Sequence, residues 1–209
     1  MADISTFLGR VLSDGLQRTN RYRCRLDLSN LGNFASRSVT GNFAGLPKAA
    51  KLLREGLLCR TTMTPSRTFE TTTVNLAGGY EETYAVGTTY NNLDCTFLCP
   101  LIDGTNQVLT LFHAWQNLIQ NRGKVNEDAN MVLKFPKEYR LEQGMRLEMF
   151  GGQEPNRDNV TTAFEYFDIY PVTVSGTTED WLTLDEMMEV AVSFSYTHWQ
   201  QVKDGDLNP

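Results

Sequence analysis

The clearest alternation of apolar and polar positions lies near the C-terminus, in MEVAVSFSYTHW, residues 188–199. Every second residue from Val190 to Tyr196 is apolar or aromatic. The positions between them are small or polar: Glu189, Ala191, Ser193, Ser195 and Thr197. Because successive side chains of a strand point to opposite faces, this pattern predicts one strand with a face in the core. Its other face would look onto water, a channel or another subunit.

A second alternating segment, YRCRLDL over residues 22–28, predicts a strand near the start of the chain. Its apolar positions would face the core, while Arg21, Arg23 and Arg25 share the other face. Two interpretations stay open for this arginine stripe. It is either a solvated face or a surface that meets an acidic neighbour, because guanidinium groups suit carboxylates.

A polar ribbon is predicted in the middle of the chain. Residues 68–76, TFETTTVNL, form one arm, Ala77, Gly78 and Gly79 mark the turn, and YEETYAV forms the other arm up to residue 86. A two-stranded ribbon with little apolar surface is marginally stable in water. We therefore expect it to lie against a second subunit.

The remaining periodicity predicts further strands at 57–63, 92–101, 131–135, 145–150 and 163–170. One helix is predicted over 107–121, where an apolar stripe recurs at helical spacing: Val108, Leu111, Phe112, Trp115, Leu118 and Ile119. His113 falls off the stripe and should lie on the surface. Pro47 and Gly56 bracket a short helix, and residues 3–17 could form an amphipathic arm. The sum predicts a mainly β fold with one or two helices.

Composition narrows the function. The chain has 209 residues, of which 41% are hydrophobic, and this suits one domain. Its net charge of −6 argues against a general nucleic-acid binder, since such proteins neutralise phosphates with clustered Lys and Arg. The start, MADISTFLGR, does not resemble a secretion signal, and no stretch has the length of an apolar membrane span. We expect a protein that is made and kept in a cytoplasm, without a membrane anchor.

Candidate chemistry is sparse. Phosphate-binding loops, nucleophile elbows and paired Cys-x-x-Cys motifs are missing from the sequence, so we expect no enzyme, cofactor or metal. The sequence has four cysteines in strand-like segments, where reduced thiols behave as small apolar residues: Cys24, Cys59, Cys95 and Cys99. They lack the close spacing that is typical of zinc ligands. Adjacent acids such as Glu81 and Glu82 are typical of solvated turns. Three tyrosines could line a sugar site or a subunit contact, and sequence leaves both open: Tyr80, Tyr84 and Tyr90.

The C-terminal third, FDIYPVTVSGTTEDWLTLDEMMEVAVSFSYTHWQ over residues 167–200, resembles the C-terminal signature of tail tube proteins of contractile-tailed bacteriophages. In that family a strand reaches an aromatic-Pro step, a loop follows, and an alternating strand ends in Tyr or His followed by Trp. The matching positions are Tyr170, Pro171, Trp181, Leu184, Glu189, Val190, Val192, Phe194, Tyr196 and Trp199. The order of upstream segments is similar too, and Gly87 stands where the family closes its long hairpin.

Two segments depart from the family pattern, an N-terminal arm at 1–19 and an insertion at 29–56. We otherwise expect one tail-tube-like domain over 1–209. The resemblance implies a β-sandwich or barrel packed by one amphipathic helix. Its copies would form hexameric rings, stacked into a tube through which phage DNA passes without specific binding. Sheath and baseplate proteins would be partners, and the virion tail, assembled in the host cytoplasm, would be the location.

The resemblance and the patterns together give three sets of candidate residues. Subunit-interface candidates are Arg21, Arg23, Arg25, Thr71, Thr73, Gly78, Gly79, Tyr80, Tyr84 and Gly87. Lumen or sheet-face candidates are Glu189, Ser193, Ser195 and Thr197, and core candidates are Trp115, Phe112, Phe194 and Tyr196. Alternative functions are a baseplate protein that initiates such a tube, an inner tube protein of a contractile injection system, and a carbohydrate-binding β-sandwich.

Overall fold

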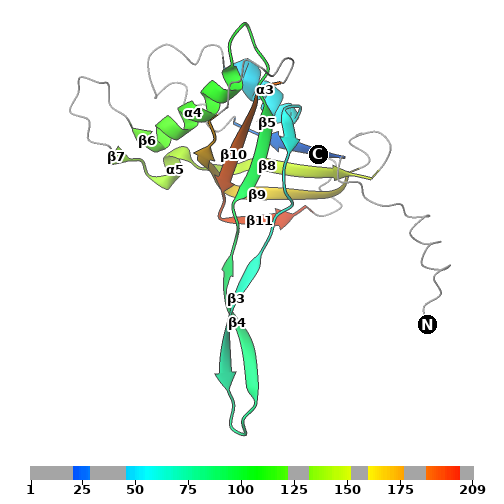
Figure 1. The fold of residues 1–209 in the computed structure, drawn as a ribbon, viewed down its shortest axis with the longest axis vertical. Coiled ribbons are helices and arrows are strands. Elements are labelled where there is room, and N and C mark those ends of the chain that lie inside the picture. Colours follow the sequence, from blue (N-terminus) through cyan, green and yellow to red (C-terminus); the bar gives the residue numbers. More distant parts are fainter. Residues whose placement is uncertain (1–20, 29–45, 122–131, 152–159, 177–186, 203–209) are drawn as a thin grey trace, which may run out of the picture.

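A single antiparallel sheet dominates the computed structural model, which describes residues 21–28, 46–121, 132–151, 160–176 and 187–202 (Figure 1). Its strand order is β1-β8-β9-β10-β5-β2, and β11 also pairs with β9. These strands are β1 (Tyr22–Leu26), β2 (Cys59–Thr61), β5 (Leu93–Leu98), β8 (Leu141–Phe150), β9 (Val160–Val174), β10 (Glu189–Ser195) and β11 (His198–Gln201). The predicted mainly β class is confirmed.

The other described elements are two small ribbons and three helices. The ribbons pair β3 (Thr68–Asn75) with β4 (Glu81–Thr89), and β6 (Gln120–Asn121) with β7 (Val132–Leu133). The helices are α3 (Pro47–Glu55), α4 (Gln107–Ile119) and the single turn α5 (Pro136–Tyr139). In the part of the chain that is described, none of these helices has the length and apolarity needed to cross a membrane.

The sheet curls into a nearly closed barrel, because its two terminal strands approach each other. The hydroxyl of Tyr22 on β1 donates a hydrogen bond to the carbonyl oxygen of Arg60 on β2. The sulfur atoms of Cys24 on β1 and Cys59 on β2 lie within 4.8 Å of each other. No backbone ladder joins β1 to β2 in the described sheet. We call this gap between β1 and β2 the seam.

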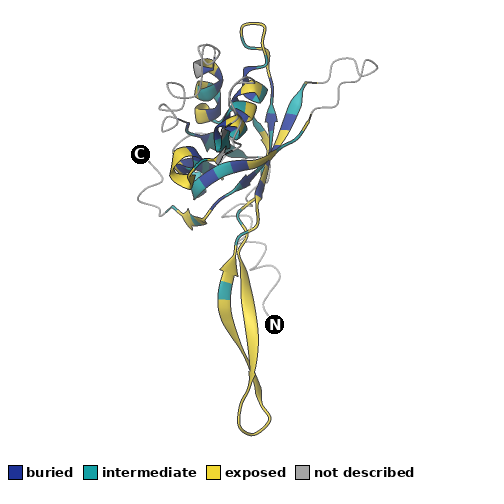
Figure 2. Cartoon of the chain, turned by 90° about the vertical axis from the view of Figure 1, so that its left-hand side faces the viewer, coloured by how far each residue is buried: buried dark blue, intermediate teal, exposed yellow. Residues whose placement is uncertain are grey.

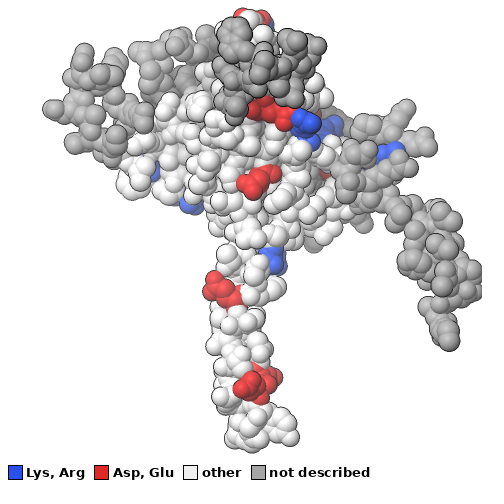
Figure 3. All heavy atoms as spheres, in the orientation of Figure 1, with Lys and Arg blue, Asp and Glu red and all other residues white. Residues whose placement is uncertain are grey.

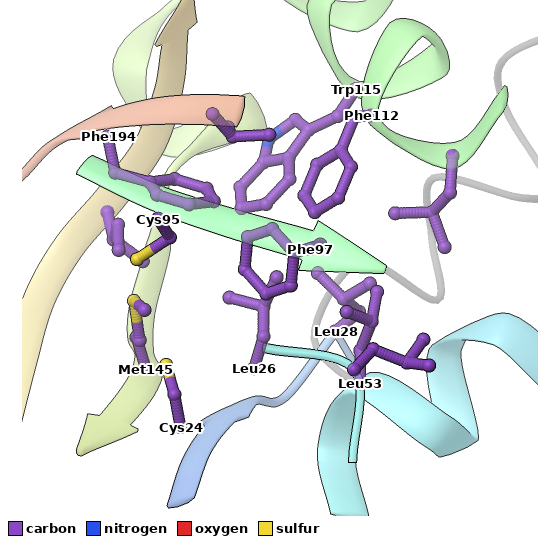
Figure 4. Close-up of a cluster of buried hydrophobic side chains, with 14 of the residues drawn as sticks. Cys24, Leu26, Leu28, Leu53, Cys95, Phe97, Phe112, Trp115, Met145 and Phe194 are labelled. Atoms are coloured by element: carbon purple, nitrogen blue, oxygen red, sulfur yellow. The ribbon is translucent and has the colours of Figure 1, made fainter. Parts of the chain in front are cut away.

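An aromatic core fills the space between the sheet and α4 (Figure 4). The ring of Phe194 lies 6.1 Å from that of Phe112 and 6.2 Å from that of Trp115. All three side chains are fully buried, and the indole nitrogen of Trp115 donates to the carbonyl oxygen of Tyr139 at 2.8 Å. The helix expected over 107–121 is present as α4, but it ends at Ile119, and residues 120–121 belong to β6. His113 is exposed on the outer side of α4.

Helix α3 is part of the same core. The predicted helix between Pro47 and Gly56 is confirmed, and Gly56 ends it in the left-handed conformation, with φ of 73°. A Cβ atom at Gly56 would lie 2.5 Å from Cγ of Arg23, so glycine is also required by the close approach of β1. Ala49 and Leu53 are buried in the barrel core. The arm at 1–19 and residues 29–45 lie outside the described residues.

The prediction of one unbroken strand over 188–199 is wrong. β10 ends at Ser195 and β11 begins at His198, and the break faces a bend in their common partner β9. At this bend Asp168 has a φ of 55°, and its carboxylate accepts a hydrogen bond from Thr197 Oγ1 at 3.0 Å. A strand that pairs with a bent neighbour must itself bend or break, and the chain breaks at Tyr196 and Thr197.

The step at Tyr170 and Pro171 was expected to end a strand, and this is also wrong, because β9 runs through it to Val174. Pro171 has no N–H for a ladder, but it pairs with Phe194 where the register between β9 and β10 shifts. The predicted strands at 131–135 and 145–150 also have different bounds, since β7 has two residues and β8 begins at Leu141.

We expect Phe194→Ala to lower the free energy of unfolding by about 3–5 kcal/mol, because it leaves a cavity between the sheet and α4. Urea denaturation followed by tryptophan fluorescence measures this loss. His113→Ala, on the exposed side of α4, is the control and should change the free energy by less than about 0.5 kcal/mol. Similar losses for both variants would contradict the described core.

Candidate assembly interface

The hairpin formed by β3 and β4 projects from the barrel, away from α3 and α4 (Figures 1 and 2). Every residue of both strands is exposed except Gly87, which is half-buried. Within the described ranges, each arm makes its extensive contacts with the other arm alone. The sequence-based expectation of a ribbon lacking a partner surface thus agrees with the observed geometry.

Apolar side chains are exposed along this hairpin to an unusual degree. The exposed fractions are 55% for Phe69, 45% for Val74, 74% for Tyr80 and 63% for Val86. Leu76 and Tyr84 are also exposed. Single exposed apolar residues are normal, but a cluster of them on one element marks an interaction surface. The surface of the hairpin is therefore more apolar than its threonine-rich sequence suggested.

The two faces of the hairpin differ in chemistry. On one face Thr71 lies opposite Ala85 and Thr73 lies opposite Thr83. On the other face Thr72 lies opposite Tyr84, and Val74 lies opposite Glu82. The interface candidates Thr71 and Thr73 are thus separated from Tyr84 by the thickness of the ribbon. A partner that contacts all three must cover both faces.

The three glycine candidates shape the hairpin backbone. Gly78 and Gly79 have φ of 111° and 81°, and they form the tip beside the candidate Tyr80. The tip is closed by a hydrogen bond from Leu76 N to the carbonyl oxygen of Tyr80 at 2.7 Å. Gly87 pairs with Glu70 next to a register shift. Their described role is to set the turn and the irregularity.

The hairpin is acidic. Residues 68–89 include three glutamates and lack lysine and arginine. Figure 3 shows acidic side chains along the projecting ribbon. At its base, the guanidinium of Arg67 lies 4.9 Å from the centre of the Trp199 ring, which attaches the ribbon to β11. A partner surface for the hairpin should therefore tolerate negative charge.

The arginine stripe of β1 meets an acidic neighbour within the same chain. Glu148 on β8 is 3% exposed, and its carboxylate lies 2.6 Å from Nη2 of Arg23 and 3.5 Å from Nε of Arg25. Arg146 contacts the same carboxylate at 3.3 Å. Sequence reasoning missed Glu148, because a lone glutamate in an alternating strand has no local signal. Arg21 contributes a backbone oxygen that accepts from Phe150 N.

Arg23, Arg25 and Arg146 line an open cleft of about 700 Å³ on the outer side of β1 and β8. Arg54 of α3 and Glu165 of β9 contribute to the same cleft. The arginine side chains of Arg23 and Arg25 keep 23% and 24% of their surface accessible. The arginine stripe is therefore partly paired with Glu148 and partly accessible to solvent.

The polar side of β10 forms a face of small side chains. Ser193 lies opposite Asp94 of β5, and Glu189 forms an ion pair with Arg60 of β2. Ser193 and Ser195 are half-buried, while Thr197 is exposed and bonded to Asp168. The core candidate Tyr196 is 8% exposed, and its ring lies 5.1 Å from that of Tyr166.

Comparisons with known proteins bear on sequence and on fold. A family profile described as phage tail tube protein matches residues 17–202. A chain of the extracellular contractile injection system, PVC sheath-tube complex in the extended state, superposes with a TM-score of 0.51 at 8% identity. That match covers 93% of this chain and 96% of the other. No curated protein sequence matches significantly.

A second solved structure is similar to the same extent. A chain of the anti-feeding prophage cap, described as the tube terminating cap, superposes with a TM-score of 0.51 at 10% identity. The match covers 90% of this chain and 91% of the other. At such identities the likeness establishes the fold alone.

We expect Glu148→Gln to lower the free energy of unfolding by about 1–3 kcal/mol, because three arginines lose their buried carboxylate partner. Chemical denaturation at neutral pH measures the change. Glu142→Gln is the matched control, because Glu142 is an exposed glutamate on the same strand β8, and its effect should stay below about 0.5 kcal/mol. Equal effects would show that the arginine cluster does not depend on Glu148.

Proposed function

Because the chain belongs to the phage tail tube protein family, we propose that its copies form hexameric rings that stack into a tube around a central channel. The profile match over residues 17–202 supports a tube component. The hexameric symmetry and the stacking follow from the resemblance that the sequence shows to this family. The protein then acts as a structural subunit and not as an enzyme.

The projecting hairpin is the observation that carries this proposal. Its apolar residues are exposed, and within the described ranges its extensive contacts are between its own two arms, so most of its surface is uncovered. A two-stranded ribbon of this kind gains stability when it lies on another protein surface. We propose that each hairpin covers a neighbouring copy, in the same ring or the next.

The interface candidates divide into two groups under this proposal. Thr71, Thr73, Tyr80 and Tyr84 belong to the donated hairpin, while Gly78, Gly79 and Gly87 give it its shape. The cleft lined by Arg23 and Arg25 suits the receiving surface, and Arg21 precedes them in the chain. Its accessible guanidinium groups complement the three glutamates of the hairpin.

The polar face of β10 is the proposed channel wall. Glu189, Ser193, Ser195 and Thr197 would look into the lumen or onto a neighbouring sheet. A wall of small and acidic groups suits DNA as passive cargo, because phosphates do not adhere to it. The net charge of −6 points the same way. The tube would then carry DNA during ejection from a virion tail assembled in the host cytoplasm.

The proposed partners are further copies of this chain, sheath proteins and baseplate proteins. The resemblance to a tube terminating cap gives the fold a second candidate role, that of a ring that ends or initiates a tube. We also propose that residues 1–209 form one domain, with an arm at 1–19 and an insertion at 29–56. Helix α3, at the end of that insertion, packs into the barrel core.

We expect the purified full chain to form rings and long tubes, and electron microscopy with native mass spectrometry checks this. Masses at multiples of six copies and regular tubes support a tube subunit. Single rings or capped discs support a terminating or initiating ring. A chain that stays monomeric at high concentration contradicts the proposal and favours the alternative of a carbohydrate-binding β-sandwich.

We expect Val74→Asp to raise the protein concentration needed for assembly by about 10–100-fold, because burial of such a side chain contributes about 1.5–3 kcal/mol. Sedimentation of assembled protein measures this. Val172→Asp is the matched control, since Val172 is 46% exposed on the barrel and Val74 is 45% exposed on the hairpin. Near-ultraviolet circular dichroism should show an intact core in both variants.

A further inference from the structure

Three cysteines that are distant in sequence meet at the seam of the barrel. Cys24 on β1, Cys59 on β2 and Cys95 on β5 place their sulfur atoms within 4.8 Å of one another. Cys24 is 1% exposed and Cys95 is 2% exposed, while Cys59 is half-buried. Figure 4 shows the side chains of Cys24 and Cys95 at one end of the aromatic core, near Met145. We call these three residues the cysteine cluster.

The spacing of the sulfur atoms suits a shared metal ion. A zinc–thiolate bond is about 2.3 Å long, so sulfur ligands around one ion lie about 3.8–4.0 Å apart in tetrahedral or trigonal geometry. The observed limit of 4.8 Å therefore requires movements of less than about 1 Å. The half-buried position of Cys59 gives an ion a route in from solvent.

The three thiols interact through hydrogen bonds and charge. Hydrogen bonds from Cys24 and then Cys59 lower the pKa of Cys95 well below its usual value. The pKa of Cys24 is raised well above its usual value, chiefly because its thiol is bonded to Cys59 and to Cys95. The three thiols are therefore close enough to be hydrogen-bonded to one another. Binding of a cation by these thiols would release their protons.

Hydroxyl groups surround the cysteine cluster. Thr62 Oγ1 lies 3.2 Å from the sulfur of Cys95, and a water molecule would complete a tetrahedral zinc site. The Tyr166 side chain is fully buried, and its hydroxyl has no hydrogen-bond partner among the described residues. Burial, followed by the charges of Cys24 and other neighbours, raises the pKa of Tyr166. Its hydroxyl thus stays protonated near the sulfurs.

We propose that Cys24, Cys59 and Cys95 bind one thiophilic ion, Zn²⁺ or Cu⁺, which fastens β1 to β2 across the seam. Thiolates select these ions over Mg²⁺ and Ca²⁺. The ion ties together the strands that no ladder joins, so its binding stabilises the closed barrel. The spacing of the cysteines along the sequence had argued against a metal, because the ligands come from three separate strands.

The fourth cysteine provides an internal control. Cys99 is buried as well, at 7% exposed, but it lies outside the cluster and its sulfur is bonded to the carbonyl oxygen of Phe97 at 3.9 Å. Cys99→Ser therefore removes a thiol without removing a proposed ligand. Cys59→Ser removes the least buried ligand, so this variant has the best prospect of folding.

The test is an anaerobic titration of the reduced full chain with Zn²⁺, and separately with Cu⁺, read by native mass spectrometry and by thermal melting. We expect one ion per chain and a higher melting temperature. Cys59→Ser should weaken binding by more than about 100-fold, since even loss of an outer partner costs 10–100-fold. Cys99→Ser should bind like the unchanged protein. Binding of Cu⁺ alone would indicate three-coordinate geometry, and binding of Zn²⁺ would indicate a fourth ligand.

Co²⁺ gives an independent readout, because thiolate ligands produce intense charge-transfer absorption in the near ultraviolet. The unchanged protein and Cys99→Ser should develop this absorption, and Cys59→Ser should lose most of it. The proposal is overturned if no stoichiometric ion binds, if both serine variants bind alike, or if the isolated protein holds a disulfide within the cluster and, once reduced, binds none of these ions.

Discussion

The bend in β9 is the constraint from which the rest of the barrel follows. One strand of fifteen residues pairs with β8 and β11 along its first part and with β10 along its second part. Asp168 permits the change of direction by adopting a positive φ, a conformation that aspartate tolerates better than most residues. Because β9 is bent, the sheet curls around the rings of Trp115 and Phe194. Its end strands β1 and β2 then lie close together, and the seam between them is the gap in the described barrel.

Those elements that carry a local pattern could be predicted from sequence. The apolar stripe of α4, the proline and glycine that delimit α3, and the alternation of β1 and β10 each follow from one periodicity or one pair of end signals. The threonine-rich hairpin with its glycine tip belongs to the same class. In all of these the residues that decide the structure are near neighbours in the chain.

The features that sequence analysis predicted wrongly or missed depend on residues far away in the chain. The residues near Pro171 carry no signal for the register shift of β10 that accommodates its missing N–H. The sequence therefore predicted that the strand ends at Tyr170. The break at Thr197 depends on Asp168, and the ion pairs of Glu148 involve arginines from two strands. The cysteine cluster is the extreme case, since its three members come from three strands. Such sites exist only once the sheet has closed.

The pairing of β1 with β8 has a consequence for biosynthesis. Arg23 and its partner Glu148 are 125 residues apart, so the first strand leaves the ribosome long before its neighbour exists. At about 5–20 residues per second, translation separates the two by roughly 6–25 seconds. Through that interval an unpaired, partly apolar β segment is available to chaperones and to nascent chains nearby. The barrel therefore closes only after β8 has been synthesised.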